Sequence, residues 1–133
     1  MTEPRMKILL VDDDPSILEI LTDLMAIFGH DYVTARDGVE AIEKLKHNVF
    51  QIVLTDMMMP NMDGMELLKH ISANYPSIKV IVVTGYDRTF TFTDVIRAGA
   101  SDFVSKPFNT DELEAKINRI VREIELLSQL ELL

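Results

Sequence analysis

Four apolar runs of the chain each end on residues that can bind or accept a phosphoryl group. The first run ends at Asp12 and Asp13, the second at Asp56, the third at Thr84 and the fourth at Lys106. If these runs are parallel strands of one sheet, their carboxyl ends lie along the same edge, which is where open α/β sheets bind ligands. Residues that are far apart in the sequence are then expected to form one site.

The three carboxylates of this set predict a metal site. Asp12, Asp13 and Asp56 on one sheet edge would repel one another, and a cation among them would relieve that repulsion. Mg²⁺ suits these donors because it binds carboxylate oxygens and waters and bridges readily to phosphate. A histidine-bound transition metal is not expected, since the three histidines are scattered without ligand spacing: His30, His47 and His70.

The same residues indicate phosphoryl chemistry. A carboxylate can attack phosphorus and form an aspartyl phosphate, and such a reaction needs mainly alignment and charge neutralisation. The Lys106 ammonium and the metal would offset the phosphoryl charge from two sides, while the Thr84 hydroxyl could donate to a phosphoryl oxygen. Each residue also has an ordinary interpretation, because Asp14 and its neighbours could cap a helix, Thr84 could end a strand and Lys106 could be a surface lysine. Their joint position at strand ends favours function.

Strand and helix patterns alternate five times, which predicts an α/β fold with a doubly wound, five-stranded parallel sheet and helices on both faces. The runs over residues 8–11, 52–54 and 80–83 are continuous and rich in Ile and Val. Such runs are typical of strands covered on both faces, so these three are expected at the centre of the sheet. Shorter or more polar runs near residues 32–35 and 103–104 suit the edges.

Several helices have recognisable starting residues. Asp14 stands before a proline as a plausible N-cap, and the first helix is expected to end at Gly29. Asp37 and Asp63 are each followed three residues later by a glutamate, a spacing that resembles a capping box. They are expected to open the second and third helices.

The last two helices are less clearly marked. Residues 89–93 alternate Thr and Phe like a strand, but a right-handed crossover requires a helix there, which is expected at about 91–98. The final helix begins near residues 109–110, and its apolar stripe runs further than the sheet requires. We therefore divide the chain into a domain at 1–122 and a helical extension at 123–133. That extension could pair with a second copy in a homodimer or lead into an output domain.

Composition excludes several classes of protein. The chain has 133 residues, which fits one domain with a real core. Thirteen basic against 22 acidic residues give a net charge of −9, so direct nucleic acid binding by this segment is not expected. No apolar stretch suits a membrane span, no signal peptide is evident, and the absence of cysteine excludes disulfides. A soluble cytoplasmic protein fits best.

Four segments together resemble the response-regulator receiver domains of two-component signalling, the chemotaxis-regulator-like family. They read LLVDDDP at 9–15, VLTDMMMPNMDG at 53–64, VVTG at 82–85 and AGASDFVSKPF at 98–108. Each occurs in the expected order and context, and the resemblance covers about residues 7–122. It implies a flavodoxin-like fold with strand order 2-1-3-4-5.

The resemblance also implies a role for individual residues. Asp56 matches the phosphoacceptor, Asp13 a direct Mg²⁺ ligand and Asp12 a ligand acting through water. The backbone carbonyl of Met58 matches a further metal ligand. The peptide bond that follows Lys106 matches one that the family holds cis.

Three residues match the parts that respond to phosphate. Thr84 and Lys106 match the two phosphate-contacting residues, and Phe103 matches the switch aromatic that turns inward as the threonine moves toward phosphate. Two bulky residues, Met58 and Tyr86, flank the phosphoryl site in such domains. Our hypothesis is that they restrict attack by water and lengthen the lifetime of the phosphorylated form.

The implied function is a phosphorylation-dependent signalling switch. A histidine kinase or phosphotransfer protein would donate the phosphoryl group to Asp56 with Mg²⁺, and the surface of the fourth helix, fifth strand and fifth helix would then change. That surface would control an output protein or a fused output domain. The chain would not be an enzyme apart from catalysing its own phosphotransfer and dephosphorylation.

Two other classes remain as alternatives. Residues 9–16 also fit a phosphatase of the haloacid-dehalogenase type with Asp12 as nucleophile, but its acidic pair would have to be Asp111 and Glu112, which suit a helix start better. The chain also lacks room for a substrate cap. A flavodoxin-like cofactor carrier is disfavoured because the loop after the first strand is acidic and carries no Gly/Ser/Thr-rich phosphate-binding sequence.

Overall fold

Five parallel strands form one sheet in the order β2-β1-β3-β4-β5 in the computed structural model, which describes residues 4–85 and 90–132. The strands are β1 Lys7–Val11, β2 Asp31–Ala35, β3 Ile52–Thr55, β4 Lys79–Thr84 and β5 Asp102–Ser105. The three continuous apolar runs are the central strands, and the two more polar runs are the edges. This confirms the strand order that the family resemblance implied.

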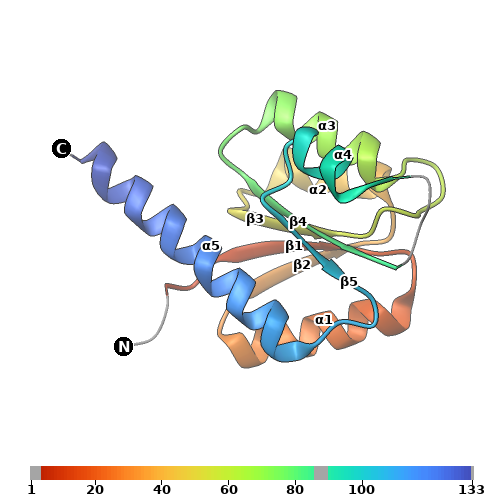
Figure 1. Ribbon diagram of the computed structural model, residues 1–133, viewed down its shortest axis with the longest axis horizontal. Helices are drawn as coiled ribbons and strands as arrows, with labels where there is room; N and C mark the ends of the chain where they lie inside the picture. The colour runs from red at the N-terminus through yellow and green to blue at the C-terminus, as the bar shows by residue number, and fades with distance from the viewer. Residues whose placement is uncertain (1–3, 86–89, 133) are drawn as a thin grey trace.

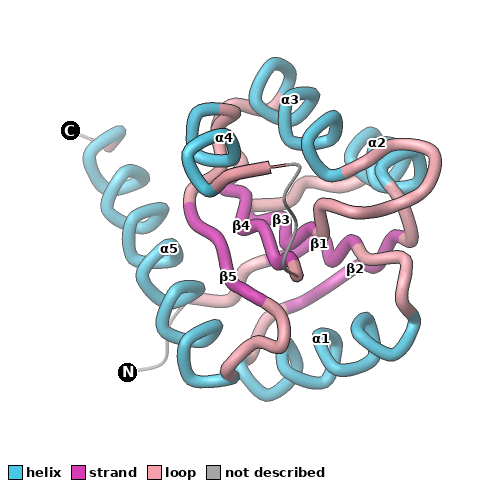
Figure 2. Tube along the Cα trace, turned by 45° about the vertical axis from the view of Figure 1, so that its right-hand side comes forward, coloured by secondary structure: helices cyan, strands magenta, loops and turns pink. Residues whose placement is uncertain are grey.

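Helices cover both faces of this sheet (Figure 1). They are α1 Pro15–Phe28, α2 Gly38–His47, α3 Gly64–Asn74, α4 Phe92–Arg97 and α5 Thr110–Glu131. Helices α1 and α5 lie on one face, and α2, α3 and α4 lie on the other, as Figure 2 also shows from a second direction. The doubly wound architecture expected from the alternating pattern is confirmed.

Alternate side chains of each central strand enter two separate cores. In β1, Leu9 and Val11 pack with the core beneath α2, α3 and α4, whereas Ile8 and Leu10 pack with the core beneath α1 and α5. All four are at most 1% exposed. Because successive strand residues point to opposite faces, two cores require apolar residues at every position. This explains the unbroken apolar runs in the sequence.

The predicted caps fix where the first three helices begin. The Asp14 carboxylate accepts the N–H of Ser16 at 2.9 Å, and α1 ends at Gly29, whose φ of 85° lies in the left-handed region that glycine adopts easily. Asp37 and Asp63 each accept the backbone N–H three residues further on, at 2.8 and 2.9 Å. Short polar side chains in the loops after the strands therefore set the starting points of the helices.

Helix α4 carries a cap that the sequence analysis did not recognise. Thr91 accepts the N–H of Asp94 at 3.1 Å, and the Asp94 carboxylate accepts the N–H of Thr91 at 3.0 Å, which is a reciprocal capping box. The helix is six residues long and buries only Val95. The helix expected at about 91–98 is present, and the strand-like alternation before it did not decide the local structure.

Helix α5 is long and continues past the sheet (Figure 1). Its 22 residues span about 33 Å at 1.5 Å per residue. The first half buries Leu113 and Ile117, whereas Leu126, Leu127 and Leu130 in the second half are 57, 49 and 54% exposed. Within the described residues, no helix combines the length and apolar character needed to cross a bilayer.

A close backbone approach explains the glycine that opens α3. A Cβ atom at Gly64 would overlap the carbonyl oxygen of Asp56 and lie 2.7 Å from the Cα of Met57. The Gly64 N–H also donates to the Met57 carbonyl at 2.9 Å. The turn after β3 is thereby folded tightly against the residue that ends the strand.

We predict that Gly64→Ala lowers the free energy of unfolding by about 1–3 kcal/mol, the usual cost of overpacking. Gly85→Ala is the matched control, since a Cβ there meets nothing within 4 Å, and it should change stability by less than about 0.5 kcal/mol. Urea denaturation of both variants measures the difference. Equal stability of the two variants would contradict the close approach.

Candidate phosphoryl and metal site

Three carboxylates converge where β1 and β3 end. The backbone N–H of Asp12 donates to the Ala35 carbonyl at 3.1 Å, and that of Asp56 donates to Val11 at 2.9 Å, so both residues continue the strand pairing. Asp12 and Asp56 are 1% and 7% exposed, while Asp13 is exposed. The expected convergence of these residues at one sheet edge is therefore present.

The Lys106 side chain joins two of these carboxylates. Its Nζ lies 2.7 Å from Asp12 Oδ2 and 3.1 Å from Asp56 Oδ2. The lysine follows β5, and its backbone N–H donates to the Thr84 carbonyl at 2.8 Å, which fixes it beside the end of β4. Residues from three strand ends thus meet around one ammonium group.

The other oxygens of the two buried carboxylates accept backbone N–H groups. Asp56 Oδ1 accepts from Met57 at 2.7 Å, and Asp12 Oδ1 accepts from Asp14 at 2.9 Å. Both carboxylates are therefore held in fixed orientations. An oriented carboxylate is the arrangement that nucleophilic attack or metal binding requires.

Burial and charge shift the acidity of this cluster. Burial raises the pKa of Asp56, the Lys106 charge opposes this rise, and the neighbouring Asp12 carboxylate adds to it. Burial alone would lower the pKa of Lys106, but its hydrogen bond to Asp12 and the Asp56 charge outweigh that effect, so the pKa of Lys106 is raised. The Lys106 ammonium therefore does not fully offset the effect of burial on the pKa of Asp56.

The carboxylates fit a divalent cation. Oxygens of Asp12, Asp13 and Asp56 lie within 4.8 Å of one another. An all-oxygen, anionic donor set matches Mg²⁺, which uses one or two carboxylates and completes its shell with water. The exposed Asp13 leaves one side open to solvent, and the excess negative charge favours a cation there.

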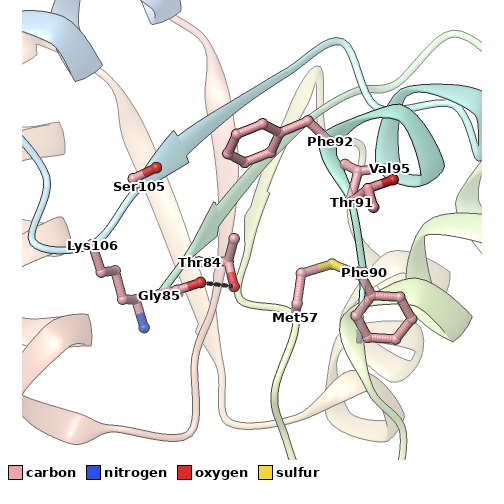
Figure 3. A pocket seen from close by; sticks show the side chains of 9 residues that line it. All are labelled: Met57, Thr84, Gly85, Phe90, Thr91, Phe92, Val95, Ser105 and Lys106. Atoms are coloured by element: carbon pink, nitrogen blue, oxygen red, sulfur yellow. Dashed lines mark hydrogen bonds between the residues drawn. The ribbon is translucent and has the colours of Figure 1, made fainter. Parts of the chain in front are cut away.

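Thr84 ends β4, and Phe103 lies on the adjacent strand β5. The Thr84 hydroxyl donates to the Gly85 carbonyl at 3.3 Å (Figure 3). Phe103 pairs in register with Val82, and its side chain is partly exposed. The Met58 side chain is 56% exposed beside Asp56, and Tyr86 lies outside the described residues.

The peptide bond between Lys106 and Pro107 is cis, as the family resemblance implied. Two contacts of Phe103 were not found from the sequence. Its ring stacks on Phe92, and its carbonyl accepts a hydrogen bond from Lys116. No spacing rule links these three residues, since the contacts depend on how α4 and α5 pack on β5.

A five-stranded doubly wound sheet with an acidic, lysine-bridged cluster at its carboxyl edge defines a flavodoxin-like α/β domain, and this edge is where open α/β sheets bind their ligands. The model of the response regulator receiver domain matches residues 8–118. The chain belongs to this family, whose members serve two-component signalling.

Individual relatives agree with this assignment. The transcriptional regulatory protein ZraR of Klebsiella oxytoca is 36% identical over 126 residues, which are 95% of this chain and 28% of that protein. A receiver domain from Clostridium thermocellum superposes with a TM-score of 0.85 at 31% identity, covering 92% of this chain and 98% of that one. NtrX from Brucella abortus superposes with a TM-score of 0.89 at 28% identity. The match covers 96% of this chain and 29% of the NtrX chain. The chain thus spans under a third of ZraR and NtrX.

We predict that Asp56→Asn raises the melting temperature of the protein at pH 7 without Mg²⁺. The pKa of Asp56 is higher in the folded state than its usual 3.8, so ionisation of this carboxyl destabilises the fold. The free energy of unfolding therefore falls as pH rises from 3.8 through the raised pKa of the folded state. The gain should shrink as pH approaches 3.8, where wild-type Asp56 is increasingly protonated in both states.

The matched control is Asp13→Asn, which removes a solvent-exposed carboxylate of the same cluster. Thermal melts of the three proteins from pH 4 to 8 measure the effect. A lower melting temperature for Asp56→Asn at pH 7 would mean that the ion pair with Lys106 outweighs the burial of this charge.

Proposed function

We propose that the domain accepts a phosphoryl group on Asp56 from a phosphohistidine of a histidine kinase or phosphotransfer protein, with Mg²⁺ as cofactor. The observation that carries this proposal is the Lys106 ammonium between the carboxylates of Asp12 and Asp56, at 2.7 and 3.1 Å. The family assignment supports it. The proposal includes a cytoplasmic location, which rests on the family.

In the transfer, a carboxylate oxygen of Asp56 forms a bond to phosphorus. The bond between phosphorus and the donor imidazole nitrogen breaks, and its electron pair stays on that nitrogen. The Lys106 ammonium lies beside the attacking carboxylate and stabilises the charge of the phosphoryl oxygens, while the Met57 N–H orients the carboxylate. Asp13, Asp56 and the Met58 carbonyl would hold Mg²⁺ directly and Asp12 would hold it through water, and the metal would supply positive charge that offsets the charge of the phosphoryl oxygens.

The response to phosphorylation involves Thr84 and Phe103. The Thr84 hydroxyl, which now donates to Gly85, turns to a phosphoryl oxygen, and Phe103 moves inward after it. The surface of α4, β5 and α5 changes as a result, and an output protein or fused output domain reads the change. The length of ZraR and NtrX beyond the matched segment supports a fused output domain.

The end of α5 is a further part of this proposal. We assign residues 1–122 to the receiver domain and residues 123–133 to an extension that either pairs with a second copy or connects to the output domain. Exposed leucines at 126, 127 and 130 support a packing role. The net charge of −9 argues against nucleic acid as the partner of this segment.

The phosphatase alternative finds less support in the geometry. Asp12 and Asp56 each accept hydrogen bonds from Lys106 and from backbone N–H groups, so these contacts do not distinguish the two candidate nucleophiles. The comparison depends on the acidic pair that the phosphatase would need. Asp111 and Glu112 lie in the first turn of α5, where Glu112 forms an ion pair with Lys116 at 3.0 Å. The acidic pair that such an enzyme needs is thus used within the helix.

We predict that acetyl phosphate with Mg²⁺ labels the protein on Asp56 and that Asp56→Asn abolishes the label. Lys106→Met should slow labelling by roughly 10²-fold, the usual effect of removing one preorganised charge. Lys46→Met is the control, because that side chain is 61% exposed on α2, and it should label normally. Mass spectrometry of the trapped peptide identifies the residue. Label or bound beryllofluoride at Asp12 would instead favour the phosphatase.

We predict that Met58→Asn shortens the lifetime of the phosphorylated protein severalfold, because a small polar side chain admits the water that the bulky thioether excludes. Val49→Asn is the control, since it changes an exposed apolar residue at the opposite end of the sheet. Loss of phosphate after removal of the donor measures both rates. An unchanged rate for Met58→Asn would contradict the hypothesis. Tyr86, its expected counterpart, can be tested in the same way.

A further inference from the structure

An apolar cavity of about 370 Å³ lies between the end of β4 and the start of α4. Met57, Phe90, Phe92 and Val95 form its apolar walls, and Thr84 also lines it (Figure 3). Phe103 is not among the described residues that line it. In this structure the ring that is expected to follow Thr84 therefore does not itself line the cavity beside Thr84.

The ring of Phe103 stacks on a ring of α4 that lines the cavity. The rings of Phe92 and Phe103 have centroids 3.8 Å apart and planes within 9° of parallel, so their faces overlap almost completely. Figure 3 shows Phe92 extending from the start of α4 toward β5. A parallel sandwich places two electron-rich faces together, and the Lys116 ammonium, 5.1 Å from the Phe103 centroid, offsets this repulsion.

Lys116 also fixes the backbone beneath this ring. Its Nζ donates to the Phe103 carbonyl at 2.6 Å and forms ion pairs with Glu112 at 3.0 Å and Asp102 at 3.5 Å. The backbone of β5 is therefore tied to α5 at the residue whose side chain must move. The ring itself stacks on Phe92 and lies near the Lys116 ammonium, and Phe92 is its aromatic neighbour on α4.

Phe92 is not a core residue. It is 51% exposed, whereas Val95 on the same helix is 3% exposed. Its position is set by the Thr91–Asp94 capping box, because it is the first residue after the cap. A half-exposed aromatic ring in this place contributes little to the interior, and its stacking partner is the residue that the proposed function requires to move.

We propose that Phe92 is a positioning residue for the switch: its stack on Phe103 stabilises the resting arrangement and so sets the fraction of molecules that are competent for phosphorylation. This inference rests on the proposed function. A ligand that binds only the competent arrangement binds more weakly in proportion to the resting population. Loss of the stack therefore strengthens the binding of a phosphoryl mimic at Asp56, although Phe92 does not touch that residue.

The test is the affinity of the protein for beryllofluoride with Mg²⁺, measured by isothermal titration calorimetry. Phe92→Leu should bind roughly two- to tenfold more tightly than wild type, the range that one aromatic pair provides. The same variant should melt at a lower temperature without beryllofluoride. A merely structural residue would lower both stability and affinity, so the opposite signs are specific to control of the resting state.

Two control variants sharpen the comparison. Phe92→Tyr keeps a ring that can stack and should bind within twofold of wild type. Ile96→Ala removes another half-exposed apolar side chain from α4 and should also leave the affinity unchanged. If Phe92→Leu folds poorly, Phe92→Met removes the ring with less loss of volume and serves the same purpose.

The outcomes separate this inference from the function on which it rests. If beryllofluoride binds Phe92→Leu as tightly as wild type, or more weakly, the role of Phe92 is overturned. The phosphoacceptor role of Asp56 then remains intact. Failure of wild type to bind beryllofluoride at all overturns the proposed function and this inference with it. Tighter binding by Phe92→Leu and by Ile96→Ala alike would also overturn it, because the effect would then belong to α4 in general.

Discussion

One ammonium group holds together carboxylates that would otherwise repel one another. Lys106 contacts both Asp12 and Asp56, which belong to different strands and are almost fully buried. A buried ion pair is costly unless its geometry is good and its remaining oxygens are satisfied. Here backbone N–H groups satisfy them, and this requires that the ends of β1, β3 and β5 be aligned. The parallel sheet is therefore a precondition for the site.

The net charge of this site is negative, and this charge affects what the site can bind. Three carboxylates face one lysine, and the pKa of Asp56 is raised by burial despite that partner. A site of this kind gains stability when a cation binds. It can then accept an anionic group that the carboxylates alone would repel. The proposed phosphoryl transfer would therefore depend on the same excess of negative charge that characterises the resting site.

The fold and most of the candidate site could be predicted from the sequence, because their signals are local. Apolar runs mark strands, aspartates at 14, 37 and 63 mark helix starts, and the chemical residues follow the strands directly. The strand order came from the family resemblance. The stack of Phe92 on Phe103 could not be predicted, since it depends on how a six-residue helix packs against β5. The orientation of the Thr84 hydroxyl could not be predicted either, because a side-chain torsion leaves no signal in the sequence.

Helix α5 begins at the same edge of the sheet as the chemical residues and ends beyond the opposite edge (Figure 1). It is also joined to β5 through Lys116, which lies less than two turns from its start. A continuous helix behaves as a rigid rod over this length. A small tilt imposed near its first turn is therefore amplified into a larger sideways displacement at its far end. If β5 moves in the proposed response, α5 would therefore convert a small shift at Lys116 into a larger one at its exposed far end.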